Sequence, residues 1–100
     1  MSDRITDKHL QYRVDRINEV LNRPKESWTR KKDGSLRANI GNFHLGGAYG
    51  RTSLQEMMNE GGGVTQTFGL YTKRELFDLM GAFLSGIEVV RKTAAGKRAA

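Results

Sequence analysis

The stretch SWTRKKDGSLRANIGNFHL, residues 27–45, decides the fold because its pattern is that of a β-hairpin. Residues 27–30 form a short candidate strand. Apolar and polar residues alternate along the start of the returning segment, 36–45, as they do in a half-buried strand. Asp33-Gly34 between them is a strong turn signal, because both residues tolerate the left-handed backbone of a tight hairpin. The centre of the chain is therefore predicted to be antiparallel sheet.

Two Gly-rich segments and two further runs follow the hairpin. Residues 46–50, GGAYG, predict the next turn, and a bulge or kink near Gly41-Asn42 would let the returning strand rejoin the core and continue up to it. Residues 51–59 fit a third strand or a short helix; we favour the strand, because a two-turn helix gains little from propensity. After the glycines at 61–63, the β-branched run 64–68 predicts a fourth strand at the sheet edge, where two copies of the chain would pair.

A first helix is predicted before the sheet, within residues 5–22. Its apolar residues recur at steps of four, three and four, which places them on one stripe of an amphipathic helix. Thr6 is suited to cap the N-terminus and Asn22 to close the C-terminus, since Pro24 disfavours helical geometry in the residue before it. The stripe consists of Leu10, Val14, Ile17 and Leu21.

A second helix is predicted to begin at Thr72. The sequence TKRE has the pattern of a capping box, in which the Thr72 and Glu75 side chains each accept a hydrogen bond from the other residue's backbone N–H. The apolar stripe continues to Val90, and we expect Gly81 and Gly86 to allow close packing. The stripe includes Leu76, Met80, Phe83 and Ile87.

Together these elements predict a single α+β domain at residues 1–90. Two helices pack on one face of a three- or four-stranded antiparallel sheet, in the order α-β-β-β-(β)-α. A chain of 100 residues is long enough for one hydrophobic core and too short for two. Residues 91–100 have no apolar stripe and are predicted to be a flexible basic tail.

The composition excludes several classes of protein. The chain has no Cys, which rules out disulfides, thiolate metal sites and a cysteine nucleophile. His9 and His44 have no carboxylate at a spacing that suggests catalysis, and surface hydrogen bonding explains Asn39 and Asn42 beside His44. We therefore expect no enzymatic activity, no metal and no cofactor. No apolar run or signal-peptide core is visible, so we expect a cytoplasmic protein with no membrane partner.

Positive charge is the most unusual bulk property of the chain. The 17 Lys and Arg against 11 Asp and Glu give a net charge of +6. Residues 23–37 carry six of the cations and two acids, and residues 91–100 carry four cations and no acid. Clustered cations favour a polyanionic partner, so we predict binding of DNA or RNA through phosphates with little sequence specificity. The predicted contact residues are Trp28, Arg30, Lys31, Lys32, Arg37, Tyr49, Arg51, Lys73, Arg74, Arg91, Lys92, Lys97 and Arg98.

Four of these contacts have specific chemical reasons. Lys73 and Arg74 oppose the helix dipole at an N-terminus, unless a phosphate binds there; otherwise they are simply exposed and screened. Trp28 lies beside the cationic loop and is either a platform for a base or part of the core. Tyr49, between glycines in a turn, is expected to be exposed and free to stack on a base or enter a partner's pocket.

Several motifs together resemble a group of short uncharacterised proteins encoded by tailed bacteriophages. They are RITDKHL at 4–10, NIGNFHLGGAYG at 39–50, NEGGGV at 59–64 and TKREL at 72–76, and the resemblance covers about residues 4–88. It implies a phage origin and the cytoplasm of an infected bacterium, and it implies no activity. The element order alone is similar to the double-stranded RNA-binding domain, in which a basic start of the second helix contacts phosphates.

A second function stays open beside nucleic-acid binding. A phage effector would bind and modulate a host protein, with the Gly-rich loops and Tyr49 as its contact surface. A third and weaker alternative is a homodimeric structural module that pairs through the edge at residues 64–68. Salt separates the first two, because binding to phosphates weakens steeply as salt rises and a protein interface changes far less.

Overall fold

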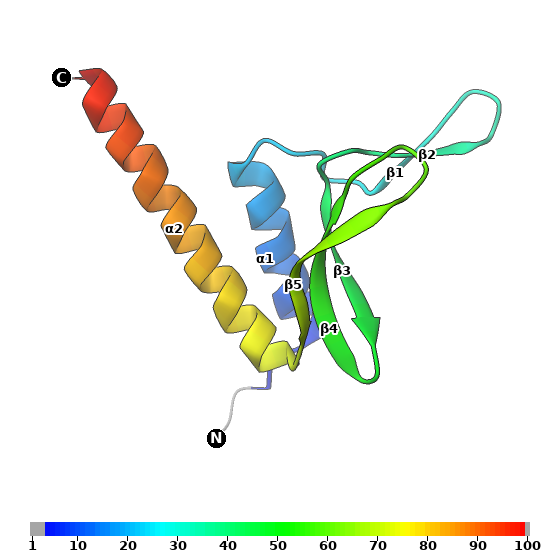
Figure 1. Ribbon diagram of the computed structural model, residues 1–100, viewed down its shortest axis with the longest axis horizontal. Helices are drawn as coiled ribbons and strands as arrows, with labels where there is room; N and C mark the ends of the chain where they lie inside the picture. The colour runs from blue at the N-terminus through cyan, green and yellow to red at the C-terminus, as the bar shows by residue number, and fades with distance from the viewer. Residues whose placement is uncertain (1–3, 100) are drawn as a thin grey trace.

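The computed structural model describes the backbone of residues 4–99 and the side chains of residues 4–93. It confirms the predicted α+β class, with two helices that flank antiparallel strands (Figure 1). In chain order the elements are α1 (Asp7–Val20), β1 (Trp28–Arg30), β2 (Leu36–Ala38), β3 (Phe43–Ala48), β4 (Arg51–Met57), β5 (Val64–Tyr71) and α2 (Lys73–Ala99).

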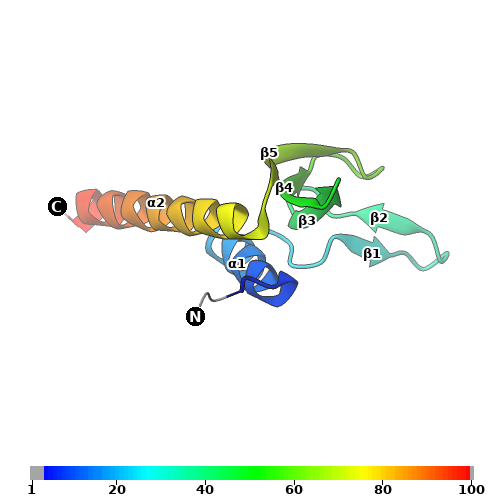
Figure 2. The same cartoon turned by 90° about the horizontal axis from the view of Figure 1, so that it is seen from below.

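The strands form two sheets, where one continuous sheet was predicted. β1 and β2 make a two-stranded hairpin, and β3, β4 and β5 make a three-stranded antiparallel sheet in that order (Figure 2). The predicted strand 36–45 bends at Gly41 and Asn42, where a bulge or kink was expected, since Gly41 has a φ of 90° and the side chain of Asn42 is fully buried. The bend is sharper than expected, because it separates β2 and β3 into different sheets. The bend lets the hairpin leave the plane of the main sheet.

The second predicted turn is shorter than GGAYG. β3 continues to Ala48, and only Tyr49 and Gly50 form the turn, with φ of 55° and 72°. Gly46 lies within β3, paired with Ser53, and the Gln55 side chain crosses it, so that a Cβ there would lie 2.5 Å from Nε2 of Gln55. The segment 51–59, for which we favoured a strand, contains β4, and β5 is an edge strand as predicted.

Both predicted N-terminal caps are confirmed, and Asn22 follows the C-terminus of α1 with a left-handed φ of 56°, as predicted. Thr6 and His9 exchange hydrogen bonds at the start of α1, and Thr72 and Glu75 do so at the start of α2. The predicted end of the second helix at Val90 is wrong, since α2 continues to Ala99. Ala, Lys and Arg are strong helix formers, so the loss of the apolar stripe does not end the helix.

One core joins both helices to the three-stranded sheet. Arg13 crosses Gly81, with its guanidinium carbon 3.6 Å from the centre of the Phe77 ring, which confirms that Gly81 allows close packing of the helices. Gly86 does not, because nothing lies within 4 Å of the position of its Cβ. The buried core consists of Leu10, Val14, Ile17, Phe43, Leu54, Leu76 and Met80.

Asn18 attaches α1 to the sheet by polar contacts inside this core. Its side-chain amide donates to Phe43 O over 3.0 Å and accepts from Phe43 N–H over 2.8 Å. Only 1% of Asn18 is exposed, so these bonds are shielded from water. The Asn18 amide thereby satisfies the backbone N–H and C=O of Phe43 on the edge of β3 that has no partner strand.

Phe83 of α2 closes the core from the side. Its ring meets Phe43 and Phe68 edge to face, with centroids 6.4 and 5.7 Å apart. We expect Phe83→Ala to lower the free energy of unfolding by about 2 kcal/mol, less than for a fully buried Phe, because Phe83 is only half-buried. Urea denaturation measures this loss, and a change below about 0.5 kcal/mol would show that the ring does not support the core.

Candidate nucleic-acid interface

Local turn chemistry builds the β1–β2 hairpin. Lys31 N–H donates to Ser35 O over 2.8 Å, and Gly34, with a φ of 88°, donates to Lys31 O over 3.0 Å. The Asp33 carboxylate accepts from the Ser35 hydroxyl at 2.6 Å and from Ser35 N–H at 2.9 Å. The hydroxyl bond, followed by the backbone bond, lowers the pKa of Asp33 because both stabilise the charged carboxylate. The predicted hairpin loop at 31–35 is thus confirmed, although only Gly34, and not Asp33, has a left-handed backbone.

Four exposed cations surround this turn, beside one acid. Arg30 folds back, and its Nη1 donates to Gly34 O over 3.0 Å. The side chains of Lys31, Lys32 and Arg37 have no hydrogen bond or ion pair with any part of the chain that the structure describes. Their charges are therefore available to a partner.

The base of the hairpin is fixed to the loop between β4 and β5. Trp28 lies across Gly62, where a Cβ would be 2.7 Å from Cη2 of the indole, and 44% of Trp28 stays exposed. Ala38 N–H donates to Glu60 O over 3.0 Å. Trp28 therefore packs the hairpin against the β4–β5 loop. It is neither part of the core nor a fully exposed platform for a base, the two roles that the sequence suggested.

Buried polar contacts set the direction of the hairpin. The Asn42 amide donates to Pro24 O at 2.8 Å and Lys25 O at 3.1 Å, and its oxygen accepts from the Ser27 hydroxyl at 2.9 Å. The same oxygen lies 3.2 Å from Nδ1 of His44. The expectation of surface hydrogen bonding is thus wrong for Asn42, which is buried. Its hydrogen bonds hold the segment between α1 and β1 against the start of β3.

A second group of predicted contacts lies at the start of α2, where acids already pair with two of the cations. Lys73 Nζ lies 3.2 Å from Asp7 Oδ1, and Arg51 Nη1 lies 3.9 Å from Glu75 Oε1. Arg74 is exposed and also has a partner within the chain. These cations are therefore less available than those of the hairpin.

The N-terminus of α2 is occupied by its own cap. Thr72 N–H donates to Glu75 Oε1 over 3.0 Å, and Glu75 N–H donates to the Thr72 hydroxyl over 3.2 Å. These bonds, and more weakly the charge of Arg51, lower the pKa of Glu75. A phosphate at this helix end, as the sequence suggested, would meet a carboxylate that already fills the position.

A third group of predicted contacts lies towards the C-terminal end of α2, where Arg91 caps the carboxyl end of α1. Its Nη1 donates to Val20 O over 2.8 Å, at the carboxyl end of α1, where a cation also interacts favourably with the helix dipole. Lys92 is exposed. The side chains of Lys97 and Arg98 lie outside those that the structure describes.

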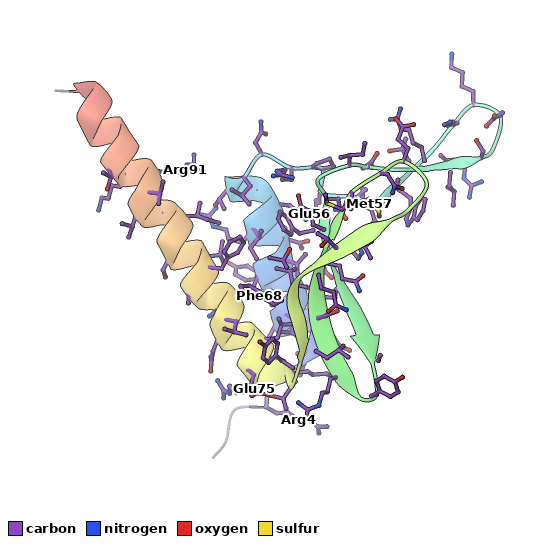
Figure 3. The ribbon with its side chains drawn as sticks, in the orientation of Figure 1. Arg4, Glu56, Met57, Phe68, Glu75 and Arg91 are labelled. Carbon is purple, nitrogen blue, oxygen red and sulfur yellow. The ribbon has the colours of Figure 1, made fainter. Side chains whose placement is uncertain are left out.

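The three groups are separate in space. The molecule is flat, with extents of 50 × 43 × 19 Å, and the hairpin and the end of α2 lie at opposite ends of its long axis (Figure 1). Figure 3 shows Arg91 far along α2 and Glu75 at the start of that helix. The predicted contacts therefore do not form one continuous surface, and the hairpin is the part with the most accessible positive charge.

Other kinds of site have less support within residues 4–99. No group of three His, Asp or Glu in this range is arranged to hold a metal ion, and neither helix has the length and apolar character of a membrane span.

Comparison with known proteins finds no matching family model, no similar curated protein and no similar solved structure.

Proposed function

We propose that the protein binds duplex DNA without catalysis, through phosphates contacted by the β1–β2 hairpin. The observation that carries this proposal is a two-stranded ribbon outside the main sheet, with four exposed cations and one acid around its turn. It projects from the body of the molecule in both views (Figures 1 and 2).

The shape of the ribbon favours DNA over RNA. The major groove of B-form DNA admits a two-stranded β-ribbon, whereas that of A-form RNA is deep and narrow. A ribbon inserted there would place Lys31 and Lys32 at the turn and Arg37 on β2 within reach of the flanking phosphates. Phosphate contacts carry no sequence information, so low specificity is expected.

Fluorescence anisotropy with a labelled mixed-sequence DNA duplex of about 20 base pairs tests the proposal, since such a duplex is about two helical turns long. We expect the logarithm of the affinity to fall linearly with the logarithm of the salt concentration, and unlabelled duplex RNA to compete less well than duplex DNA. Absence of binding at about 50 mM salt would refute DNA binding, and stronger competition by RNA would refute the choice of DNA.

Tyr49 favours a second candidate function, which is binding and modulation of a host protein. Its side chain is 95% exposed, and its backbone has a φ of 55°, a conformation that costs a non-Gly residue about 1–2 kcal/mol. An aromatic residue held in a strained turn without packing gains nothing for the fold. It is suited to enter a pocket on a partner.

We expect Tyr49→Asn to raise the free energy of unfolding by about 0.5–1 kcal/mol, because Asn tolerates the left-handed turn better than Tyr. Urea denaturation measures the change. A loss of stability would instead mean that the Tyr49 ring supports the fold, which would remove this reason for a binding role. Tyr12→Asn is the control, since Tyr12 is 73% exposed but helical, and it should show no such gain.

A further inference from the structure

One face of the β1–β2 hairpin is largely apolar and only partly covered. Residues that pair directly across two antiparallel strands share a face, so the pairs Trp28–Ala38 and Arg30–Leu36 place all four side chains on one side of the ribbon. The β4–β5 loop reaches this face at its base, where Trp28 lies across Gly62 and Ala38 is buried. Leu36 is two residues nearer the turn and is 53% exposed. The apolar face therefore ends in an uncovered leucine.

Leu36 is placed among cations and away from the core. It is not one of the residues that pack against the hydrophobic core of the described chain. Single exposed leucines are common on protein surfaces, so the exposure alone identifies no role. Here, however, Lys31 and Lys32 lie at the adjacent turn, and Arg37 follows in β2. The hairpin thus combines an exposed apolar group with positive charge that is not paired within the described residues.

The two faces of the ribbon carry different side chains. Arg37 pairs with Thr29, so both lie on the face opposite Leu36. In both views the turn of the hairpin extends past the β4–β5 loop (Figures 1 and 2). If the Leu36 face is turned to the floor of a DNA groove, Arg37 lies away from the base edges, in keeping with a phosphate contact.

The major groove of DNA complements both properties of the hairpin. Phosphates run along its two edges, and each A·T pair presents the C5-methyl group of thymine on its floor. A second copy of the hairpin would instead bring Lys31, Lys32 and Arg37 against the same cations. Apolar side chains pack against the thymine methyl group, whereas a G·C pair offers only polar groups at this edge.

We propose that Leu36 contacts thymine methyl groups in the major groove, so that the protein prefers DNA rich in A·T pairs. The inference rests on the proposed binding of duplex DNA by the hairpin. It adds a modest sequence preference to phosphate contacts that carry none. Full burial of one methyl group strengthens binding by about fourfold, which sets the scale of the preference.

Two duplexes that differ only in methyl groups test the inference. One has about 20 base pairs, most of them A·T, and the other has deoxyuridine in place of every thymidine. Both have the same phosphates and the same hydrogen-bonding edges, so the slopes of log affinity against log salt should agree. By fluorescence anisotropy, we expect the wild-type chain to bind the uracil duplex at least about threefold more weakly.

The outcomes separate this inference from the proposed function. Equal affinity for the thymine and uracil duplexes would overturn the thymine contact and leave DNA binding through phosphates intact. Absence of binding to either duplex at about 50 mM salt would overturn both.

Variants of Leu36 test whether this side chain carries the preference. In Leu36→Ser the ratio of the two affinities should fall from about 3 or more to about 1, whereas Leu36→Met keeps an apolar side chain of similar volume and should retain the ratio. Val89→Ser is the control, since Val89 is 63% exposed but lies on α2, and it should also retain the ratio. A ratio near 1 in Leu36→Met, or an unchanged ratio in Leu36→Ser, would overturn the assignment to Leu36.

Discussion

Replacing Lys31, Lys32 and Arg37 with Gln is expected to weaken binding to a mixed-sequence DNA duplex about 1,000-fold at about 50 mM salt. Each phosphate contact that is lost removes about 0.9 from the slope of log affinity against log salt, which amounts to about one order of magnitude at this salt concentration. The total slope should therefore flatten by about 2.7. Arg30 is left in place because its bond to Gly34 O belongs to the turn.

The matched control removes the same charge elsewhere. Arg4, Lys8 and Lys25 are exposed and lie outside the hairpin, and replacing them with Gln lowers the net charge equally. We expect the control to shift the slope by less than about 1, because it changes the overall field but no direct contact. Equal effects of the two triple variants would contradict the hairpin as the binding element. Urea denaturation of both variants should show nearly unchanged stability, since the bonds of Asp33 to Ser35 are retained.

The features of the fold that the sequence predicted correctly depend on neighbouring residues. The caps at Thr6 and Thr72 and the Asp33-Gly34 turn each involve hydrogen bonds that span four or fewer residues. Such contacts are visible as short motifs in the chain. They are also independent of how the helices and strands later pack.

The features that were predicted wrongly depend on residues far apart in the sequence. The kink at Gly41 was expected, but the separation of β2 and β3 into two sheets was not. That separation follows from Asn42, whose amide bonds to the carbonyl oxygens of Pro24 and Lys25, 18 and 17 residues away. Gly46 was predicted to be a turn residue from its neighbours in sequence, but it pairs with Ser53 of β4, and the Gln55 side chain occupies the space that a Cβ would need. No local pattern contains either contact.

The candidate site shows the same division. The hairpin could be predicted because its cations and its turn are contiguous, so that one local structure brings them together. Arg91 was grouped with them on charge alone, yet its partner Val20 is 71 residues away and makes it a contact between helices. Lys73 is likewise paired with Asp7, from the first turn of α1. Net charge therefore overstated how many cations are available to a partner.

Asn18→Leu is expected to cause the largest loss of stability from a single substitution, about 2–6 kcal/mol, although Leu has the same branched shape as Asn and favours helix. Leu cannot pair with Phe43 N–H or Phe43 O, and each of these backbone groups would be left buried without a partner, at about 1–3 kcal/mol each. The melting temperature should fall by at least about 10 °C, as expected for a domain of this size.

Gln11→Leu is the control for this substitution, because Gln11 lies on the exposed side of α1 and bonds only to Asp15 through its side chain. It should change the free energy of unfolding by less than about 0.5 kcal/mol. Hydrogen exchange of the Phe43 amide adds a local measurement, since its N–H has no strand beyond β3 to protect it and depends on Asn18. A loss below about 1 kcal/mol for Asn18→Leu, or slow exchange at Phe43 in that variant, would show that another group satisfies the edge of β3.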